Sequence, residues 1–139
     1  MKRSLLLAAV LLPGLVACAS NLARVTDRGV ESRYVDYAGE PIERFTAFNL
    51  DGWAPVSRNQ LVVWNGPAEA YLLKVWDNCR DLMFADGVGI TSTTRTVTKF
   101  EKVRVGRESC PIDEIRPIDV VRMRADRAAA ADARRGAAP

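Results

Sequence analysis

The sequence predicts a mainly β fold of the α+β class: a small antiparallel sheet, arranged as a sandwich or a partly open barrel, with one or two short helices, after a cleaved signal peptide. Two observations predict it. Between residues 45 and 105, short runs rich in aromatic and β-branched residues alternate with Gly, Asn, Asp and Pro, which is the composition of strands joined by turns. The chain has 139 residues, of which 48% are hydrophobic, enough for the core of one domain once a targeting segment is removed.

The N-terminus has the features of an export signal. Two cations, Lys2 and Arg3, precede the apolar run LLLAAVLLPGLVA, which is too short for a permanent membrane span and suits the h-region of a signal peptide. The run ends in Leu15-Val16-Ala17-Cys18, which resembles the lipobox of bacterial lipoproteins. We therefore expect residues 1–17 to be a lipoprotein signal peptide and Cys18 to be the site of lipid attachment. The alternative, an ordinary secretory signal cut at Ala17-Cys18-Ala19, leaves Cys18 without a role.

Lipid attachment would set the location of the protein. Several acyl chains on one residue make an effectively permanent anchor, so a membrane is an expected partner. Ala19 follows Cys18, and by analogy with Gram-negative sorting this favours the periplasmic face of the outer membrane. Residues 18–30, which contain the polar stretch ASNLARVTDRG, are expected to form a lipidated tether, which as a flexible chain spans about 20 Å.

Cys79 and Cys110 are the two remaining cysteines. In an exported chain such a pair is normally a disulfide, and closing a loop of this length stabilises a domain by about 3 to 4 kcal/mol. The alternative of a redox or metal-binding pair has little support, because the chain has no C-x-x-C spacing and no histidine.

Residues 31–121 are expected to form the single globular domain. The spacing of Val30, Tyr34 and Tyr37 predicts a helix that ends at residues 38–41, AGEP. Three strands are predicted at residues 44–50, 60–65 and 69–76, with turns at Asp51-Gly52 and Asn65-Gly66-Pro67. A single helical turn is expected at residues 78–85, with Leu82 and Met83 directed inward.

The second half of the domain is less regular. The many β-branched residues in 89–105 predict one or two strands of a hairpin, with Val97, Val103 and Val105 on one face. In the stretch CPIDEIRPIDVV, residues 110–121, Ile112 and Ile115 fit a helical turn that Pro117 would stop, and residues 118–121 would form a last strand. Residues 122–139 are rich in Ala and Arg without a broad apolar stripe, so they are expected to be either a solvated helix or disordered.

The charge distribution argues against a nucleic-acid partner. The formal net charge is +3, but the excess of basic residues lies at the two ends of the chain. The C-terminal end holds five arginines, Arg122, Arg124, Arg127, Arg134 and Arg135, whereas the middle of the chain is slightly acidic. A nucleic-acid interface needs a basic patch on the folded domain, and the central sequence does not predict one.

Catalytic chemistry has few candidates. Without histidine the common nucleophilic triads and most zinc sites are excluded, so we predict no catalytic residue, metal or cofactor. Two carboxylate pairs, Asp77 with Asp81 and Asp113 with Glu114, remain as acid and base candidates, although each fits a solvated position better. Arg116 is expected to pair with Asp113 or Asp119, or else to bind an anion.

The aromatic residues allow a second kind of site. They are either core residues or a stacking platform for a sugar or a peptidoglycan strand, and the residues concerned are Trp53, Trp64, Tyr71 and Trp76.

Short motifs along the chain resemble a family of small proteobacterial lipoproteins catalogued as domain of unknown function 6491. The matching features are Tyr37-Ala38-Gly39 with Pro41, Trp53 with Pro55, Val63-Trp64, Glu69-Ala70-Tyr71-Leu72-Leu73, Cys79 with Leu82, Ile90-Thr91-Ser92, Phe100 with Val103, and Cys110 with Ile112, Ile115-Arg116-Pro117 and Asp119. The resemblance supports a Cys79–Cys110 pair and implies no activity.

The expected function is that of a cell-envelope lipoprotein without enzymatic activity. It would be a binding or structural module in the outer membrane, facing the periplasm, with an envelope protein or peptidoglycan as its partner. The alternatives are a periplasmic enzyme that uses carboxylates or a small-ligand pocket, and an inhibitor of a lytic enzyme.

Overall fold

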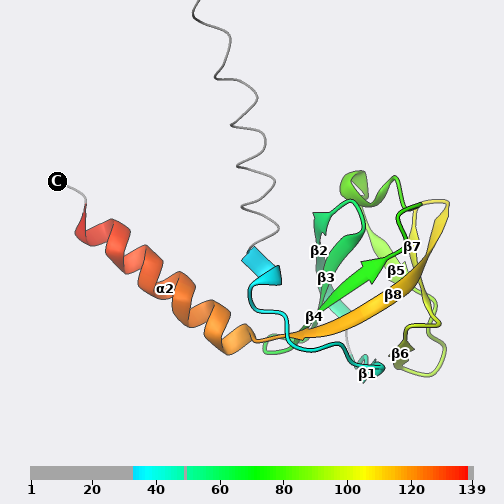
Figure 1. Ribbon diagram of the computed structural model, residues 1–139, viewed down its shortest axis with the longest axis horizontal. Helices are drawn as coiled ribbons and strands as arrows, with labels where there is room; N and C mark the ends of the chain where they lie inside the picture. Colours follow the sequence, from blue (N-terminus) through cyan, green and yellow to red (C-terminus); the bar gives the residue numbers. More distant parts are fainter. Residues whose placement is uncertain (1–32, 49, 138–139) are drawn as a thin grey trace, which may run out of the picture.

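The protein is a small antiparallel β-barrel with a helix extending from one end (Figure 1). A computed structural model describes residues 33–48 and 50–137. Its elements, in chain order, are β1 (Arg44–Thr46), β2 (Leu50–Ser57), β3 (Gln60–Asn65), β4 (Ala70–Val75), the 3₁₀ turn η1 (Leu82–Phe84), β5 (Val88–Ile90), β6 (Thr96–Thr98), β7 (Lys102–Val105), β8 (Glu108–Ile118) and α2 (Val120–Gly136). Residues 33–35 are also helical. The predicted mainly β fold, with antiparallel sheet and helices, is confirmed; the predicted signal peptide lies outside the described residues.

The main sheet nearly closes on itself. Its six strands lie in the order β2-β3-β4-β8-β7-β5, and β1 pairs with β6 in a separate two-stranded sheet. The two edge strands, β2 and β5, face each other across a hollow of about 270 Å³ lined by residues of both, including Trp53 and Val88. Of the two arrangements that the sequence allowed, the structure therefore has the partly open barrel.

Two apolar clusters hold the sheet from its two faces. Leu61, Leu73 and Ile115 are buried inside the barrel. On the outer face, Val62 and Leu72 pack with Val120 and Met123 from the start of α2. Strands β3 and β4 are covered on both faces in this way, which is why their sequences are continuous apolar runs instead of alternating ones.

The helical turn predicted within residues 110–115 is wrong, because this stretch belongs to the eleven-residue strand β8. Ile112 and Ile115 both face the interior although their spacing is odd. The register along β4 shifts here, with Val75 opposite Ile112 and Lys74 opposite Glu114, and the extra residue of this bulge is Asp113. Because a bulge adds one residue to a strand, two residues that are three positions apart can lie on the same face. The i, i+3 spacing of Ile112 and Ile115 therefore occurs here in a strand and not in a helix.

The end of β8 also differs from the prediction. Residues 118–121 were expected to form a strand, but β8 ends at Ile118 and α2 begins at Val120. The side chain of Asp119 accepts a 2.9 Å hydrogen bond from the backbone N–H of Arg122. This is the geometry of a helix N-cap, which satisfies a donor that the first turn leaves unpaired.

The turn predicted at Asp51-Gly52 is wrong as well. Both residues lie inside β2, where the register with β3 shifts between Leu50 and Gly52, so this dipeptide marks a bulge and not a turn. The chain reverses instead between Ser57 and Gln60, which pair with each other at the end of the β2–β3 hairpin. The turn predicted at residues 65–67 is present, and Gly66 has the positive φ of +86° that favours glycine.

The first described residues lie against the end of β8 and the start of α2. The backbone N–H of Gly39 donates a 2.8 Å hydrogen bond to the carbonyl of Pro117, and the N–H of Asp119 donates to Tyr37. The helical residues end at Val35, just before the helix end predicted at residues 38–41, and a Cβ on Gly39 would meet the Pro117 ring at an ordinary contact distance of 3.4 Å. Val30, the first residue of that predicted helix, lies outside the described residues.

Candidate functional site

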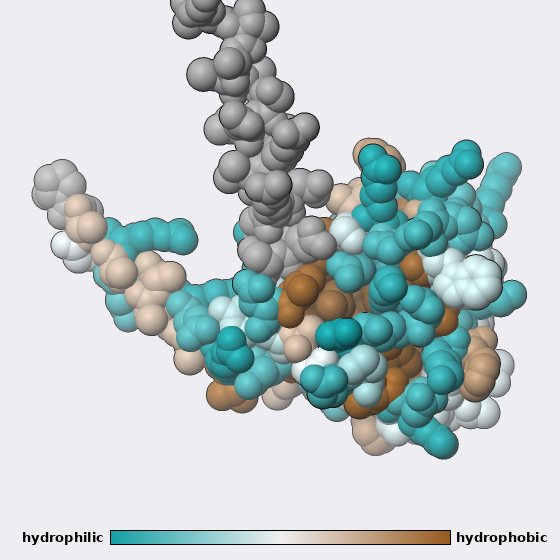
Figure 2. All heavy atoms as spheres, in the orientation of Figure 1, coloured by the Kyte–Doolittle hydropathy of each residue, from teal (hydrophilic) through white to brown (hydrophobic). Residues whose placement is uncertain are grey.

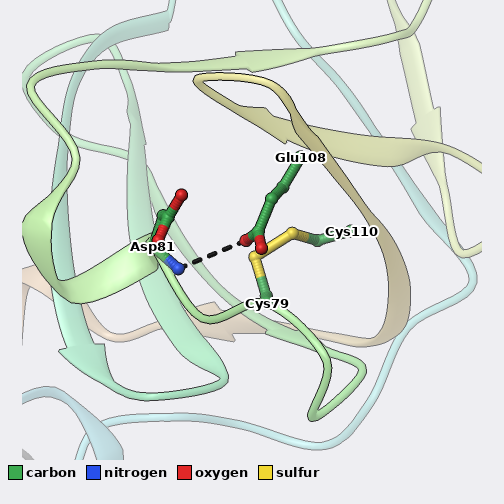
Figure 3. The surroundings of a disulfide bond; sticks show 4 residues. All are labelled: Cys79, Asp81, Glu108 and Cys110. Atoms are coloured by element: carbon green, nitrogen blue, oxygen red, sulfur yellow. Dashed lines mark hydrogen bonds between the residues drawn. A yellow bond between two sulfur atoms is a disulfide. The ribbon is translucent and has the colours of Figure 1, made fainter.

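The disulfide joins the loop after β4 to the start of β8. Cys79 and Cys110 are bonded with their Cα atoms 5.6 Å apart, as predicted, and they are only 2% and 1% exposed. The backbone N–H of Asp81 donates a 3.2 Å hydrogen bond to Oε2 of Glu108, which ties the same two segments together beside the sulfurs (Figure 3). The loop is thus held at two points, and its side chains have a fixed position at this end of the barrel.

The pair does not have the properties of a metal or redox site. Among the described residues, one group has ligand atoms close enough to hold a metal ion, and it consists of Cys79, Glu108 and Cys110. Both sulfurs are in the disulfide, so neither is the thiolate that a metal requires. Thiol–disulfide exchange needs access of an attacking thiolate to a sulfur, and burial of both residues prevents that access.

Next to the disulfide lies a hollow of about 1120 Å³, which we call the disulfide-end hollow. Arg58 and Asn59 enter it from the β2–β3 turn, and Asp77 and Arg80 from the loop that carries Cys79. The full lining is Ser57, Arg58, Asn59, Asp77, Cys79, Arg80, Met83 and Phe84. The end of the β2–β3 hairpin and the segment from Asp77 through η1, which the disulfide fixes, therefore supply all of its side chains.

Apolar side chains are unusually exposed around this hollow. Phe84 is 86% exposed, and Trp76, three residues before Cys79, is 58% exposed. Met83, which was expected to face inward, is also exposed, whereas Leu82 is fully buried. The single turn of η1 explains the difference, because three consecutive residues on one turn point in different directions and only one reaches the core.

The polar side chains of the hollow are two arginines and one carboxylate. Asp77 accepts a 2.7 Å hydrogen bond from the amide of Asn59. Within the described part of the chain, the guanidinium groups of Arg58 and Arg80 have no hydrogen bond or ion pair. The hollow thus presents free positive charge next to exposed apolar surface. No sequence pattern identified Arg58, Arg80 or Phe84 as site residues; the one signal near them is the run of three apolar residues, Leu82, Met83 and Phe84, in the predicted helical turn.

The carboxylate pairs do not form acid and base sites. Asp77 lines the disulfide-end hollow, but Asp81 does not. The backbone N–H of Asp81 donates a hydrogen bond to Glu108. Asp113 forms a 3.0 Å ion pair with Lys74, and Glu114 pairs with Arg116. The prediction that Arg116 pairs with Asp113 or Asp119 is therefore wrong. Its partner is Glu114, which is two residues away and lies on the same face of β8.

The four aromatic residues of the predicted platform are not brought together. Trp53 packs against the interior cluster, and Trp64 packs against the outer one. Tyr71 is buried and its ring stacks on Phe45 at a centroid distance of 3.9 Å. Trp76 is the one member that is mostly exposed, so these residues do not form a common stacking surface.

Tyr71 belongs to a polar network on the same barrel. Its hydroxyl donates to Glu69, which also accepts a 2.5 Å hydrogen bond from the amide of Asn65. Asn65 in turn donates to the carbonyl of Thr46 and accepts from the N–H of Phe48. Burial and the bond to Glu69 raise the pKa of Tyr71. The network holds the segment after β1 against β3, and each named side chain already has a partner, so we regard it as structural.

No helix within residues 33–48 and 50–137 has the length and apolar character needed to span a bilayer. A family model described as "Family of unknown function (DUF6491)" matches residues 1–134. Neither the curated proteins nor the solved structures include a significant match to the chain.

Proposed function

The chain belongs to the DUF6491 family, whose description supplies no activity, and we propose from its own residues that it is a non-enzymatic binding module of the cell envelope. In this proposal Cys18 carries the lipid anchor, the anchor holds the domain at the periplasmic face of the outer membrane, and the disulfide-end hollow binds a protein partner. Each part has its own support and its own test.

The observation that carries the proposal is the pairing of the cysteines. The chain has three cysteines, and the bond between Cys79 and Cys110 uses two of them. Disulfides persist in oxidising compartments such as the periplasm and are rare in the cytosol, so the bond supports export. Cys18 is left without a cysteine partner in its own chain and follows a lipobox-like sequence, which supports its use as the lipid acceptor.

The hollow supports binding more than catalysis. It has one carboxylate, Asp77, which is engaged by Asn59, so the hollow lacks the pair of converging carboxylates that a two-carboxylate mechanism uses. Exposed aromatic and Met side chains next to arginines are typical of the central contacts of protein interfaces. The free charge of Arg58 and Arg80 favours a partner segment that carries a carboxylate beside an apolar side chain.

The anchor is tested by metabolic labelling. Cells that express the natural chain are grown with radiolabelled palmitate, and the Cys18→Ala variant serves as the matched control. We expect label in the natural chain and none in the variant, together with loss of the variant from the outer-membrane fraction. Equal labelling of both proteins, or a mature natural chain that begins at a residue other than Cys18, would refute the anchor.

The binding surface is tested by photocrosslinking in intact cells. A photoreactive residue replaces Phe84 in one variant and Phe100 in the control; both side chains are largely exposed, at 86% and 84%. We expect a discrete crosslinked protein from position 84 that is absent at position 100 and is lost on Arg58→Gln/Arg80→Gln substitution. Crosslinks to peptidoglycan, or identical products from both positions, would contradict a protein partner at the hollow. A captured cell-wall hydrolase would identify the module as an inhibitor.

A further inference from the structure

Helix α2 extends from the barrel for most of its length (Figure 1). Only Val120 and Met123 of its 17 residues are buried; apart from the exposed Val121 and Gly136, the other residues are charged or alanine (Figure 2). At 1.5 Å per residue the helix is about 25 Å long. A helix without a broad apolar stripe gains little from packing against its own domain, so most of α2 is free to contact another surface.

Four of the five arginines of α2 lie on one side of it. At about 100° per residue, they fall within an arc of about 100° that contains neither aspartate of the helix. These residues, which we call the arginine face, are Arg124, Arg127, Arg134 and Arg135. Val120 lies within the same arc and Met123 borders it, so the arginine face continues the side of the helix that packs on the barrel.

Part of the arginine face is engaged within the chain: the guanidinium of Arg124 donates to the carbonyl of Pro67, and that of Arg135 pairs with Asp132. The guanidinium of Arg127 lies over the ring of Tyr34, 5.4 Å from its centroid. Tyr34 is 16 residues after Cys18, and a chain of that length reaches no more than about 55 Å even when fully extended. A lipid at Cys18 therefore keeps α2 close to the membrane surface.

We propose that the arginine face of α2 docks on the anionic headgroups of the membrane that holds the lipid anchor. The proposal rests on the proposed anchor at Cys18. Each basic side chain near an anionic surface strengthens binding by about fivefold, and a single covalent anchor leaves the orientation of a domain free. The helix would supply the second contact that fixes this orientation.

The orientation matters for the disulfide-end hollow. Strand β8 (Glu108–Ile118) leads directly into α2. Cys110, beside the hollow, is near its start, so the hollow and the helix lie toward opposite ends of this strand, about 26 Å apart along it. With α2 on the headgroups, the hollow points away from the membrane, where a partner in the periplasm can reach it.

The test uses the mature full chain, purified from membranes and reconstituted into vesicles. One set of vesicles is pure phosphatidylcholine and the other contains phosphatidylglycerol, and amide hydrogen exchange is followed by mass spectrometry over residues 124–136. We expect exchange in this segment to be at least tenfold slower on the anionic vesicles. Because the contact is electrostatic and exposed, 0.5 M salt should abolish the difference.

Two variants of equal charge change identify the surface. Arg134→Gln/Arg135→Gln removes the two arginines that do not contact the barrel, and it should abolish most of the protection. The control, Lys102→Gln/Arg104→Gln, removes two exposed cations from β7 and should leave the protection unchanged. Equal exchange on both vesicles, equal loss in both variants, or protection by a soluble polyanion in place of vesicles would overturn the inference. Absence of lipid on Cys18 would refute the proposed anchor but would leave the docking of α2 testable. Exchange can be measured with added vesicles whether or not the chain is lipidated.

Discussion

The hydroxyl of Tyr37 donates a 3.0 Å hydrogen bond to the carboxylate of Asp126, 89 residues further along the chain. The ring of the same tyrosine lies under the guanidinium of Arg122, at 5.2 Å. These contacts attach the first turns of α2 to the segment that precedes the barrel. They act together with the Arg127–Tyr34 contact, so the direction of the helix depends on two tyrosines near the start of the domain.

Substitution Tyr37→Phe removes the hydroxyl and keeps the ring under Arg122. We expect amide exchange in residues 122–127 to become faster at neutral pH, while exchange in β3 and β4 stays unchanged, because only the attachment of the helix is weakened. Hydrogen exchange with mass spectrometry measures both regions in one experiment. Unchanged exchange in α2 would show that the ring contact alone holds the helix.

The bond between Tyr71 and Glu69 predicts a loss of stability at alkaline pH. Burial, followed by the bond to Glu69, raises the pKa of Tyr71 above its ordinary value of 10.0. A group whose pKa is raised by folding contributes stability that is fully present below its unfolded pKa and is lost as the pH rises toward its folded pKa. The contribution of Tyr71 is therefore complete at pH 8 and declines above pH 10.

The variant Tyr71→Phe should lower the free energy of unfolding by about 1.5 kcal/mol at pH 8, because Glu69 loses a donor. The difference from the natural protein should narrow above pH 10, as measured by urea denaturation at both pH values. Tyr34→Phe is the control, since the Tyr34 hydroxyl makes no hydrogen bond within the described residues. A difference that stays constant from pH 8 to pH 11 would contradict the assignment.

The disulfide predicts a large effect on stability. Replacing both partners in Cys79→Ser/Cys110→Ser opens a loop with a sequence separation of 31 and should lower the free energy of unfolding by about 3 to 4 kcal/mol. Reductant should have little effect on the folded natural protein, because both cysteines are buried. Urea denaturation of the two proteins tests this, and Cys18→Ser serves as the single-cysteine control. A decrease below about 1 kcal/mol would mean that the barrel does not depend on the bond.

The N-cap of α2 predicts a smaller and local effect. Asp119→Ala removes the acceptor for the N–H of Arg122 and should cost about 1 kcal/mol, whereas Asp119→Ser keeps an acceptor and most of the stability. Thermal unfolding followed by circular dichroism compares the two variants. Equal melting temperatures for Ala and Ser would argue that the side chain does not cap the helix.

Short stretches of sequence were sufficient to predict the strands and turns that depend on neighbouring residues. The apolar runs at residues 60–65 and 69–76 are strands, and Gly66 makes the turn after the first of them, because hydrophobic content and turn chemistry act over a few residues. The cysteine pair followed from composition and context, since two cysteines in an exported chain have few other uses. The expectation of lipid at Cys18 is of the same local kind, and it stays a prediction.

Where the signals were ambiguous, tertiary contacts decided. Ile112 and Ile115 have the spacing of a helix, but pairing with β4 makes them part of a strand, and a bulge at Asp113 brings both to the interior. Residues 50–52 contain a turn signal that the β2–β3 pairing converts into a bulge. In both cases hydrogen bonds to a neighbouring strand outweigh a local preference of a few tenths of a kcal/mol.

Composition and short motifs in the sequence were sufficient to predict a small β domain, a cysteine pair and a basic C-terminal end; export stays a prediction. Only the tertiary structure could place Arg58, Arg80 and Phe84 around one hollow, or bring the guanidinium of Arg127 over the ring of Tyr34. The reason is physical. Propensities and motifs act between neighbours in the chain, whereas a binding surface is made by side chains that only sheet closure and helix docking bring together.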